Sequence, residues 1–388
     1  MIKYDLFIQF KKDRINFLII KIKENEIQTE DIKDSIILVN TDIENNLSNL
    51  ISKKISEIEN TIKFNFKDCI LLLPSEDLKI IKATSFKENL NNQITKKEVQ
   101  FNLNNLKSVF DEQERIYKLI HIFNSRFIVD DQTVYNLPLN KFCKNFKQEN
   151  TFIYLLKNRV KNYAKIINEC NLNIKKLFLS DYALASSLTN KFLLNKKNYI
   201  NVFLKRKSIS FFNMQHNSLV DVGTYKFGSD IIYKDIEKIC SINFEEVKDI
   251  INNIEQKGTI IKTNQYNHEN KKITHEFIVE IGKARIEEIL KIILSNFQFN
   301  INKNKKDFVL YLFFEDLGIK NFFKSAISNT LINNLEINLF PAADLNDQFR
   351  SCRSAANIYY YGWESEAIPV IPDNTSGILK FLRKLIGI

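Results

Sequence analysis

The sequence predicts an α/β protein of two similar halves, with a small α+β domain inserted into the first half. Two observations indicate the halves: a strand hairpin around a charged turn begins each of them, and a helical pattern follows each hairpin. A third observation is a strand-rich stretch of different character at residues 76–160. The chain has 388 residues, of which 44% are hydrophobic and 26% charged, so it can bury more than one core.

The first half begins with strands predicted at residues 4–10 and 15–22, joined by the turn Lys11-Lys12-Asp13-Arg14. A third strand is predicted at 35–39. Residues 42–64 have apolar side chains at spacings of three and four, which indicates an amphipathic helix. A buried strand at 69–73 then ends at Pro74. The first domain therefore begins with residues 1–75.

Residues 76–160 are predicted to form the inserted domain. We expect a helix around 103–110, strands at 116–123 and 127–129 that pair across Asn124-Ser125, and a strand at 151–156. The first domain returns at 161–190. A helix is predicted there at 157–170, a strand at 176–179 and a second helix at 181–189.

The second domain, residues 191–350, repeats the opening hairpin. Strands at 199–204 and 209–214 flank the turn Lys205-Arg206-Lys207-Ser208, and a strand at 220–225 follows. We expect helices at 229–239, 244–254, 281–297 and 318–333, and strands at 259–262, 273–279 and 308–314. A closing helix of the first domain is predicted at 351–365.

The last segment has the most specific pattern. Residues 366–376 include Pro369 and Pro372 and predict an extended linker. On a helical wheel, residues 377–388 divide into two faces without an acidic residue. The apolar face has Ile378, Leu379, Phe381, Leu382, Leu385, Ile386 and Ile388, and the basic face has Lys380, Arg383 and Lys384. This pattern predicts a helix in the interface of an anionic membrane. The alternative is a final helix that packs on the body.

One short interfacial helix binds weakly, so lasting attachment requires several chains side by side. The chain is therefore expected to bind itself. No segment has the pattern of an export signal or a membrane span, and five separated cysteines favour a reduced, cytoplasmic protein.

Composition disfavours several other functions. Only eight glycines occur, the first at Gly223, and no Gly-x-Gly or Gly-Lys-Ser/Thr is present, which excludes Walker and Rossmann phosphate loops. The net charge of +10 arises from 56 basic residues of which nine are arginine, and this disfavours nucleic-acid binding, for which arginine is the preferred contact. The four histidines have no metal-ligand spacing, so we expect no metal site.

Several segments in order along the chain resemble the FtsA family, actin-like bacterial cell-division proteins that tether the FtsZ ring to the membrane. The segment 121–130 resembles the end of the family's inserted domain. Cys170-Asn171-Leu172, Leu177-Phe178-Leu179 and 183–187 are similar to its helix, strand and alanine-rich helix. Further similarities are Gly228, Asp235-Ile236, Phe244-Glu245-Glu246, Ala355-Ala356, Tyr361-Gly362 and the terminal 377–388.

The resemblance implies an actin-like, ribonuclease-H-like fold with an SHS2-like insertion, ATP bound between the halves, and polymerisation. The chain departs from the family at its phosphate loops. Lys11 and Lys12 stand in the first loop, Lys205, Arg206, Lys207 and Ser208 in the second, and Tyr311-Leu312-Phe313 in the adenosine loop. Because glycines and metal-orienting aspartates are missing, we expect a pseudo-ATPase. The basic turns either attract an anion or are simply solvated.

The resemblance also implies a surface for the acidic FtsZ tail, with Arg285 as its main residue and Lys283 and Lys291 in the same row. The alternative is a solvated helix face.

The preferred function is a membrane adaptor of the division ring at the cytoplasmic face of the inner membrane. The rivals are an actin-like adaptor of a type IV pilus or secretion platform, and a relative of the sugar kinases, for which catalytic residues are missing.

Overall fold

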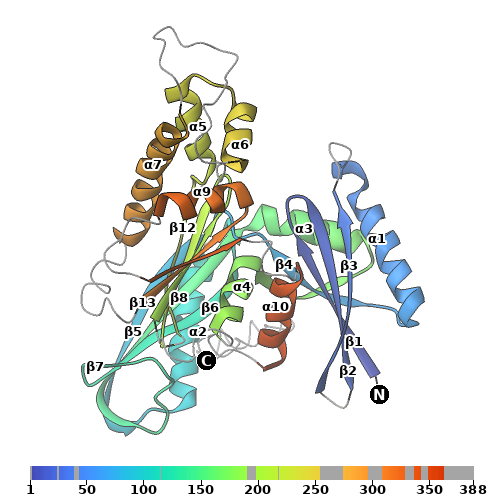
Figure 1. Cartoon of the computed structure of the whole chain (residues 1–388). Coiled ribbons are helices and arrows are strands. Elements are labelled where there is room, and N and C mark those ends of the chain that lie inside the picture. The colour runs from blue at the N-terminus through green and yellow to red at the C-terminus, as the bar shows by residue number, and fades with distance from the viewer. Residues whose placement is uncertain are drawn as a thin grey trace.

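The computed structural model describes residues 2–23, 26–38, 43–113, 115–189, 198–216, 218–253, 274–295, 308–327, 336–341 and 348–361. These residues form three sheets with helices packed on them (Figure 1). The linker 366–376, the terminal segment 377–388 and the strand predicted at 259–262 lie outside the described residues.

The sheet of the first half has the order β3-β2-β1-β4-β9. Its strands are β1 (Ile2–Phe10), β2 (Arg14–Lys23), β3 (Glu26–Ile37), β4 (Asp68–Leu73) and β9 (Asn173–Leu179). The first three strands are antiparallel neighbours, whereas β4 runs parallel to both β1 and β9. Parallel neighbours need crossover helices, which are α1 (Ile43–Ile62) before β4 and α3 (Lys157–Glu169) before β9.

The sheet of the second half repeats this order as β12-β11-β10-β13-β14. Its strands are β10 (Asn198–Leu204), β11 (Ile209–Gln215), β12 (Ser218–Tyr225), β13 (Phe308–Phe314) and β14 (Glu336–Pro341). In both halves the strands therefore lie in the order third, second, first, fourth, fifth, with the same directions. Every residue of β10, β11 and β13 is buried, as expected for strands covered on both faces.

Four helices pack on one face of the second sheet. They are α5 (Asp230–Cys240), α6 (Phe244–Asn252), α7 (His275–Ser295) and α9 (Leu317–Ile327). Asn243 and Glu246 form a capping box that starts α6. The strand expected at 273–279 is wrong, because α7 begins at His275 and continues through that segment.

The third sheet, β5-β8-β6-β7, lies within the insertion. It consists of β5 (Lys79–Gln93), β6 (Tyr117–Val129), β7 (Gln132–Val134) and β8 (Phe142–Leu156), with α2 (Lys96–Gln113) packed on one face. The turn expected at Asn124-Ser125 is wrong: β6 runs through it, and the chain reverses at Asp130 and Asp131, both with positive φ. Asn124 and Ser125 are buried and hydrogen bond across to β8.

The two halves share one core. Helix α4 (Ser180–Thr189) lies beside α10 (Arg350–Tyr361) between the two five-stranded sheets (Figure 1). The same cluster of buried side chains includes Phe7 of β1, Tyr182 of α4, Ala355 of α10 and Phe212 of β11. The two halves are therefore joined through α4 and α10 by continuous apolar packing.

All five cysteines are free thiols. Among the described residues, no helix has the length and apolarity needed to cross a membrane.

Candidate functional site at the two hairpin turns

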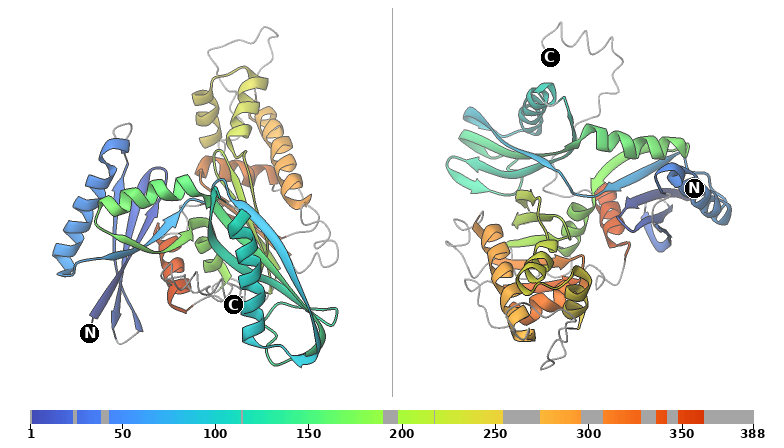
Figure 2. Two further views of the ribbon diagram at one scale, coloured as in Figure 1. Left: turned by 180° about the vertical axis from the view of Figure 1, so that it is seen from behind. Right: turned by 90° about the horizontal axis from the view of Figure 1, so that it is seen from above.

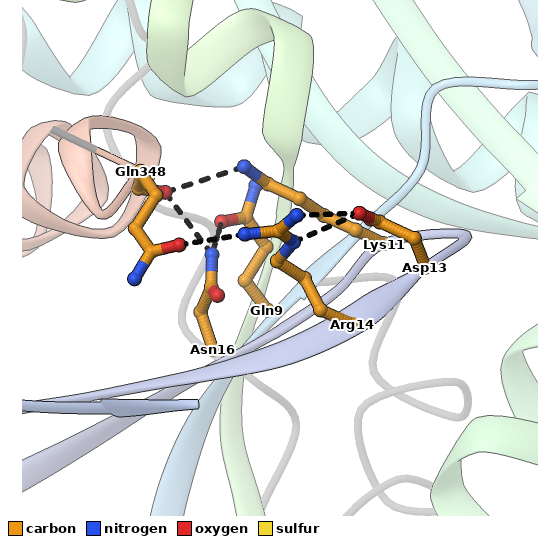
Figure 3. A network of polar contacts seen from close by, with 6 residues as sticks. All are labelled: Gln9, Lys11, Asp13, Arg14, Asn16 and Gln348. Atoms are coloured by element: carbon orange, nitrogen blue, oxygen red, sulfur yellow. Dashed lines mark hydrogen bonds and ion pairs between the residues drawn. The ribbon is translucent and has the colours of Figure 1, made fainter. Parts of the chain in front are cut away.

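The first hairpin turn, residues 11–13, joins β1 to β2 and is bonded to Gln348, two residues before α10 (Figure 3). The Lys11 amide donates to the Arg14 carbonyl at 2.9 Å, which closes the turn. The Lys11 ammonium donates to the Gln348 carbonyl oxygen at 3.2 Å, and the Arg14 guanidinium donates to the Gln348 side-chain oxygen at 2.9 Å. Lys12 is exposed.

The buried side-chain amides of Gln9 and Asn16 form hydrogen bonds next to this turn. The Asn16 side-chain amide donates to Gln9 Oε1 at 3.1 Å and to the Gln348 carbonyl at 3.0 Å (Figure 3). Gln9 is 1% exposed and Asn16 is fully buried. The Arg14 guanidinium also hydrogen bonds to the Asp13 carboxylate, and this bond lowers the pKa of Asp13. Gln348 therefore accepts hydrogen bonds from Lys11 and Arg14 of the turn region and from the buried Asn16 beside it.

The backbone of the second turn, residues 205–208, is also bonded within the protein. The Lys205 amide donates to the Ser208 carbonyl at 3.0 Å. The first amides of the α5 region, those of Ser229 and Asp230, donate to the carbonyls of Lys205 and Arg206, both at 2.9 Å. The amide N–H groups at this helix start, which could otherwise bind a phosphate, are thus already used by the turn.

The side chains of the second turn are paired with acids. The Lys205 ammonium lies 2.8 Å from the Asp181 carboxylate, which also accepts the Ser210 hydroxyl at 2.7 Å. The Arg206 guanidinium pairs with Asp230 at 2.9 Å, and this hydrogen bond raises the pKa of Arg206. Lys207 is exposed, and Ser208 is partly buried.

A third carboxylate, that of Glu315, also bonds the second turn. The Arg206 amide donates to Glu315 Oε2 at 3.0 Å, and the Glu315 amide donates to the Leu204 carbonyl at 3.1 Å. Glu315 directly follows β13, next to the segment that the resemblance assigns to an adenosine loop. Tyr311-Leu312-Phe313, which the resemblance put in that loop, instead lie inside the buried strand β13.

Sequence reasoning missed the acidic partners Asp181, Asp230 and Glu315. Asp181 is 7% exposed and lies in the first turn of α4, two residues after the end of β9. In the sequence, only the strand predicted at 176–179 indicates this position. Each of these three carboxylates already has a hydrogen-bond or ion-pair partner. In the part of the chain that the structure covers, no group of three or more histidine, cysteine or acidic residues could hold a metal ion.

The residues predicted for the FtsZ tail lie on α7 but do not form one row. At about 100° per residue, Arg285 lies more than about 100° around the helix from both Lys283 and Lys291. Arg285 pairs with Asp235 and, at 2.6 Å, with Glu288; the hydrogen bond to Asp235 raises the pKa of Arg285. Lys291 is exposed and Lys283 is partly buried.

No family model matches the sequence. No curated protein matches it either. Solved structures do match: a PilM-PilN type IV pilus biogenesis complex has a TM-score of 0.52 and 8% identity over 93% of this chain and 97% of that chain. A Bacteroides thetaiotaomicron protein with actin-like ATPase fold and unknown function has a TM-score of 0.42 and 10% identity, covering 91% and 95%. MreB 5 of Spiroplasma citri bound to AMPPNP has a TM-score of 0.39 and 11% identity, covering 91% and 96%. At such low identity the likeness concerns the fold alone, and together with the duplicated strand order it confirms the predicted class: the chain has an actin-like α/β fold.

Proposed function

We propose that this chain is a non-enzymatic actin-like adaptor that ties a protein assembly to the cytoplasmic face of a membrane. The observation that carries the proposal is the closure of both hairpin turns by the protein's own side chains. In an actin-like ATPase, phosphate would meet free amides and uncompensated cations at these turns. Here Gln348 bonds the first turn, while Asp181, Asp230 and Glu315 bond the second.

The electrostatics of the second turn favour the same conclusion. A triphosphate would have to displace the Asp181 carboxylate from Lys205 and the Asp230 carboxylate from Arg206. The triphosphate would also be repelled by three carboxylates. Magnesium normally offsets such repulsion, but the described residues include no group that could hold this ion. Binding would therefore exchange existing charge pairs for new ones and gain little free energy.

Isothermal titration of the full chain with ATP and magnesium tests this part. We expect no binding at micromolar nucleotide and no phosphate release. A matched control is the Asp181→Asn variant, which frees the Lys205 ammonium from its acidic partner. Micromolar affinity with turnover in the natural sequence would refute the pseudo-ATPase assignment.

The membrane part of the proposal depends on the sequence pattern of residues 377–388, with seven apolar residues on one face and three basic residues on the other. Deletion of 377–388 should lower recovery of the chain with anionic vesicles, measured by flotation. The matched control exchanges Lys380 and Leu382, which keeps the composition but weakens the separation of the two faces.

The preferred assembly is the division ring, through the acidic tail of FtsZ, because the sequence resembles the FtsA family along most of its length. The chain would then lie at the division site and bind other copies of itself. Co-sedimentation with FtsZ and anionic vesicles, together and separately, tests this partner. The Arg285→Glu variant tests the predicted contact residue, and Lys320→Glu on α9 is its control. Unchanged FtsZ-tail affinity would remove Arg285 from the contact.

A second candidate is an adaptor of a type IV pilus or secretion platform. Its support is the likeness to the PilM-PilN complex, which covers nearly the whole of both chains, inserted domain included. Such an adaptor would dock on a membrane protein and would not need the terminal segment to reach lipid. Membrane recovery that is unchanged after deletion of 377–388, together with no FtsZ binding, would favour this second candidate.

A further inference from the structure

A basic surface with an exposed apolar tip lies where the insertion joins the first half. It consists of Arg115 and Ile116, in the turn between α2 and β6, and the exposed lysines of α3; we call it the α3 patch. Its members are Arg115, Ile116, Lys157, Lys161 and Lys165, all of them exposed.

The α3 patch is continuous in space. The Lys157 amide donates to the Ile116 carbonyl at 2.8 Å, which fixes the turn against the first residue of α3. Lys157, Lys161 and Lys165 follow at intervals of four, so they lie within an arc of about 80° on one side of the helix. In the view from behind, α3 lies on the outside of the molecule (Figure 2, left).

Among the described side chains, the cations of the patch have few acidic partners. In the described part of the chain, Arg115, Lys157 and Lys161 form no ion pair. Lys165 lies 3.8 Å from Glu169, but its side chain is 79% exposed, so this pair is weak. By contrast Arg159, which points inward from the same helix, is bonded to Glu76. The other exposed residues of this side are the uncharged Asn158, Asn162 and Asn168.

Ile116 is the apolar part of the patch. Ile116 is 64% exposed and follows Arg115 in the turn between α2 and β6. An apolar side chain that projects among cations suits a bilayer interface, where the cations meet headgroups and the apolar group enters the acyl boundary. An acidic peptide would instead favour a groove with pockets for its own side chains, whereas one side of a helix and a turn tip are convex.

We infer that the α3 patch binds the anionic lipid surface and so gives the body its own contact with the membrane. This inference rests on the proposed membrane function and adds a second contact to that of residues 377–388. Two weak contacts on one chain act together, because attachment by the first raises the effective concentration of the second at the membrane. The patch would also fix which side of the molecule faces the lipid.

The test uses full-length protein and vesicles of phosphatidylcholine with phosphatidylglycerol, compared with vesicles of phosphatidylcholine alone. The variant replaces Lys157, Lys161 and Lys165 by Gln. At about fivefold per lysine near an anionic surface, we expect affinity for the anionic vesicles to fall by about 100-fold. The control replaces Lys234, Lys238 and Lys248, three exposed lysines of α5 and α6, by Gln. It removes the same charge and should leave the affinity nearly unchanged.

Two further variants separate this inference from the proposed function. Ile116→Ser should weaken anionic-vesicle binding at constant charge. In a chain without 377–388, residual binding to anionic vesicles should persist and should disappear with the three α3 substitutions. If the α3 and control variants lose equal affinity, the binding is unspecific and the inference is overturned. If only deletion of 377–388 affects binding, the patch is not a lipid contact although the membrane proposal stands. If the α3 variant loses affinity for an acidic peptide but not for vesicles, the patch is a protein surface.

Discussion

The Lys205 ammonium links the two halves of the molecule through the Asp181 carboxylate. Their atoms are 2.8 Å apart, and the side chains are 20% and 10% exposed. Two charged groups with such low exposure have lost much of their hydration, and their mutual attraction compensates for that loss. The Ser210 hydroxyl is the second donor to the same carboxylate oxygen.

Replacing Lys205 by Met should lower the free energy of unfolding by about 3 kcal/mol, because Asp181 would stay buried without its cation. Urea denaturation measures this change. The double variant Lys205→Met with Asp181→Asn leaves no unpaired charge and should recover much of the loss. Equal losses in the single and double variants would show that the pair contributes only packing.

Alkaline pH should destabilise the protein. Burial raises the pKa of Cys69 to about 12, and burial raises the pKa values of Tyr233 and Tyr360 as well. In the unfolded chain a thiol ionises near pH ~8.5 and a phenol near pH ~10. A raised pKa in the folded state gives stability that is complete below the unfolded pKa and is lost as the pH rises towards the folded pKa.

We therefore expect the free energy of unfolding to decline from about pH 8.5 upwards, measured by urea denaturation at a series of pH values. Cys69→Ala should make this decline shallower between about pH 8.5 and about pH 10, but should not abolish it, because burial also raises the pKa values of Cys170 and Cys240. A flat profile up to about pH 10 in the natural sequence would contradict the role assigned to Cys69.

The partners of the basic turns could not be predicted from the sequence. Lys11 and Gln348 are 337 residues apart, and no local pattern connects them. The basic character of both turns was evident in the sequence, but whether those charges were free depended on contacts between distant segments. Asp181 shows the same limit, since a carboxylate at a helix start usually indicates only a favourable end of the helix dipole.

The second hairpin turn and the start of α5 are packed against each other without space for a side chain. A Cβ atom added to Gly228 would lie 2.1 Å from the Lys205 carbonyl oxygen and 2.7 Å from the Arg206 carbonyl carbon. Both are backbone atoms, so they cannot rotate away. The glycine is therefore required by close approach of two segments.

Gly228→Ala should cost about 2 kcal/mol of stability, because the turn must move away from α5. The matched control is Gly318→Ala, where the nearest atom is the end of the flexible Asn252 side chain. Thermal unfolding of the two variants measures the difference. Equal effects would mean that the turn can shift freely.

Most elements were predictable because their local patterns are strong. The runs that form β10, β11 and β13 are almost wholly apolar and are buried along their full length. The predictions that were wrong or missing have physical reasons. Asn124 and Ser125 look like a turn, but they lie in β6. Asn124 is paired with Asn150 of β8 and accepts a hydrogen bond from it, and the Ser125 hydroxyl hydrogen bonds to Thr151. β14 was not predicted, although it pairs in parallel with β13 along its length.

The shared core around α4 and α10 should make the two halves of the molecule unfold together. The duplicated plan was predictable from two hairpins followed by helices, but the shared core depends on how α4 and α10 pack between the sheets. Ala355 is fully buried in that layer.

Ala355→Leu should therefore reduce protection from hydrogen exchange in β1 and β10 by a similar amount, corresponding to about 2 kcal/mol. Mass spectrometry of exchanged peptides measures both strands in one experiment. Ala284→Leu, at an exposed position of α7, is the control and should change neither strand. A loss of protection confined to β1 would show that the halves open independently.

The position of α10 has a mechanical consequence. Before α10, Gln348 bonds the β1–β2 turn, and near the end of the helix the Tyr360 hydroxyl donates to Asp5 of β1. Tension applied to the chain beyond Tyr361 would thus act on a helix that is anchored near both of its ends. It would not peel an edge strand from a sheet, which is a much weaker geometry under force.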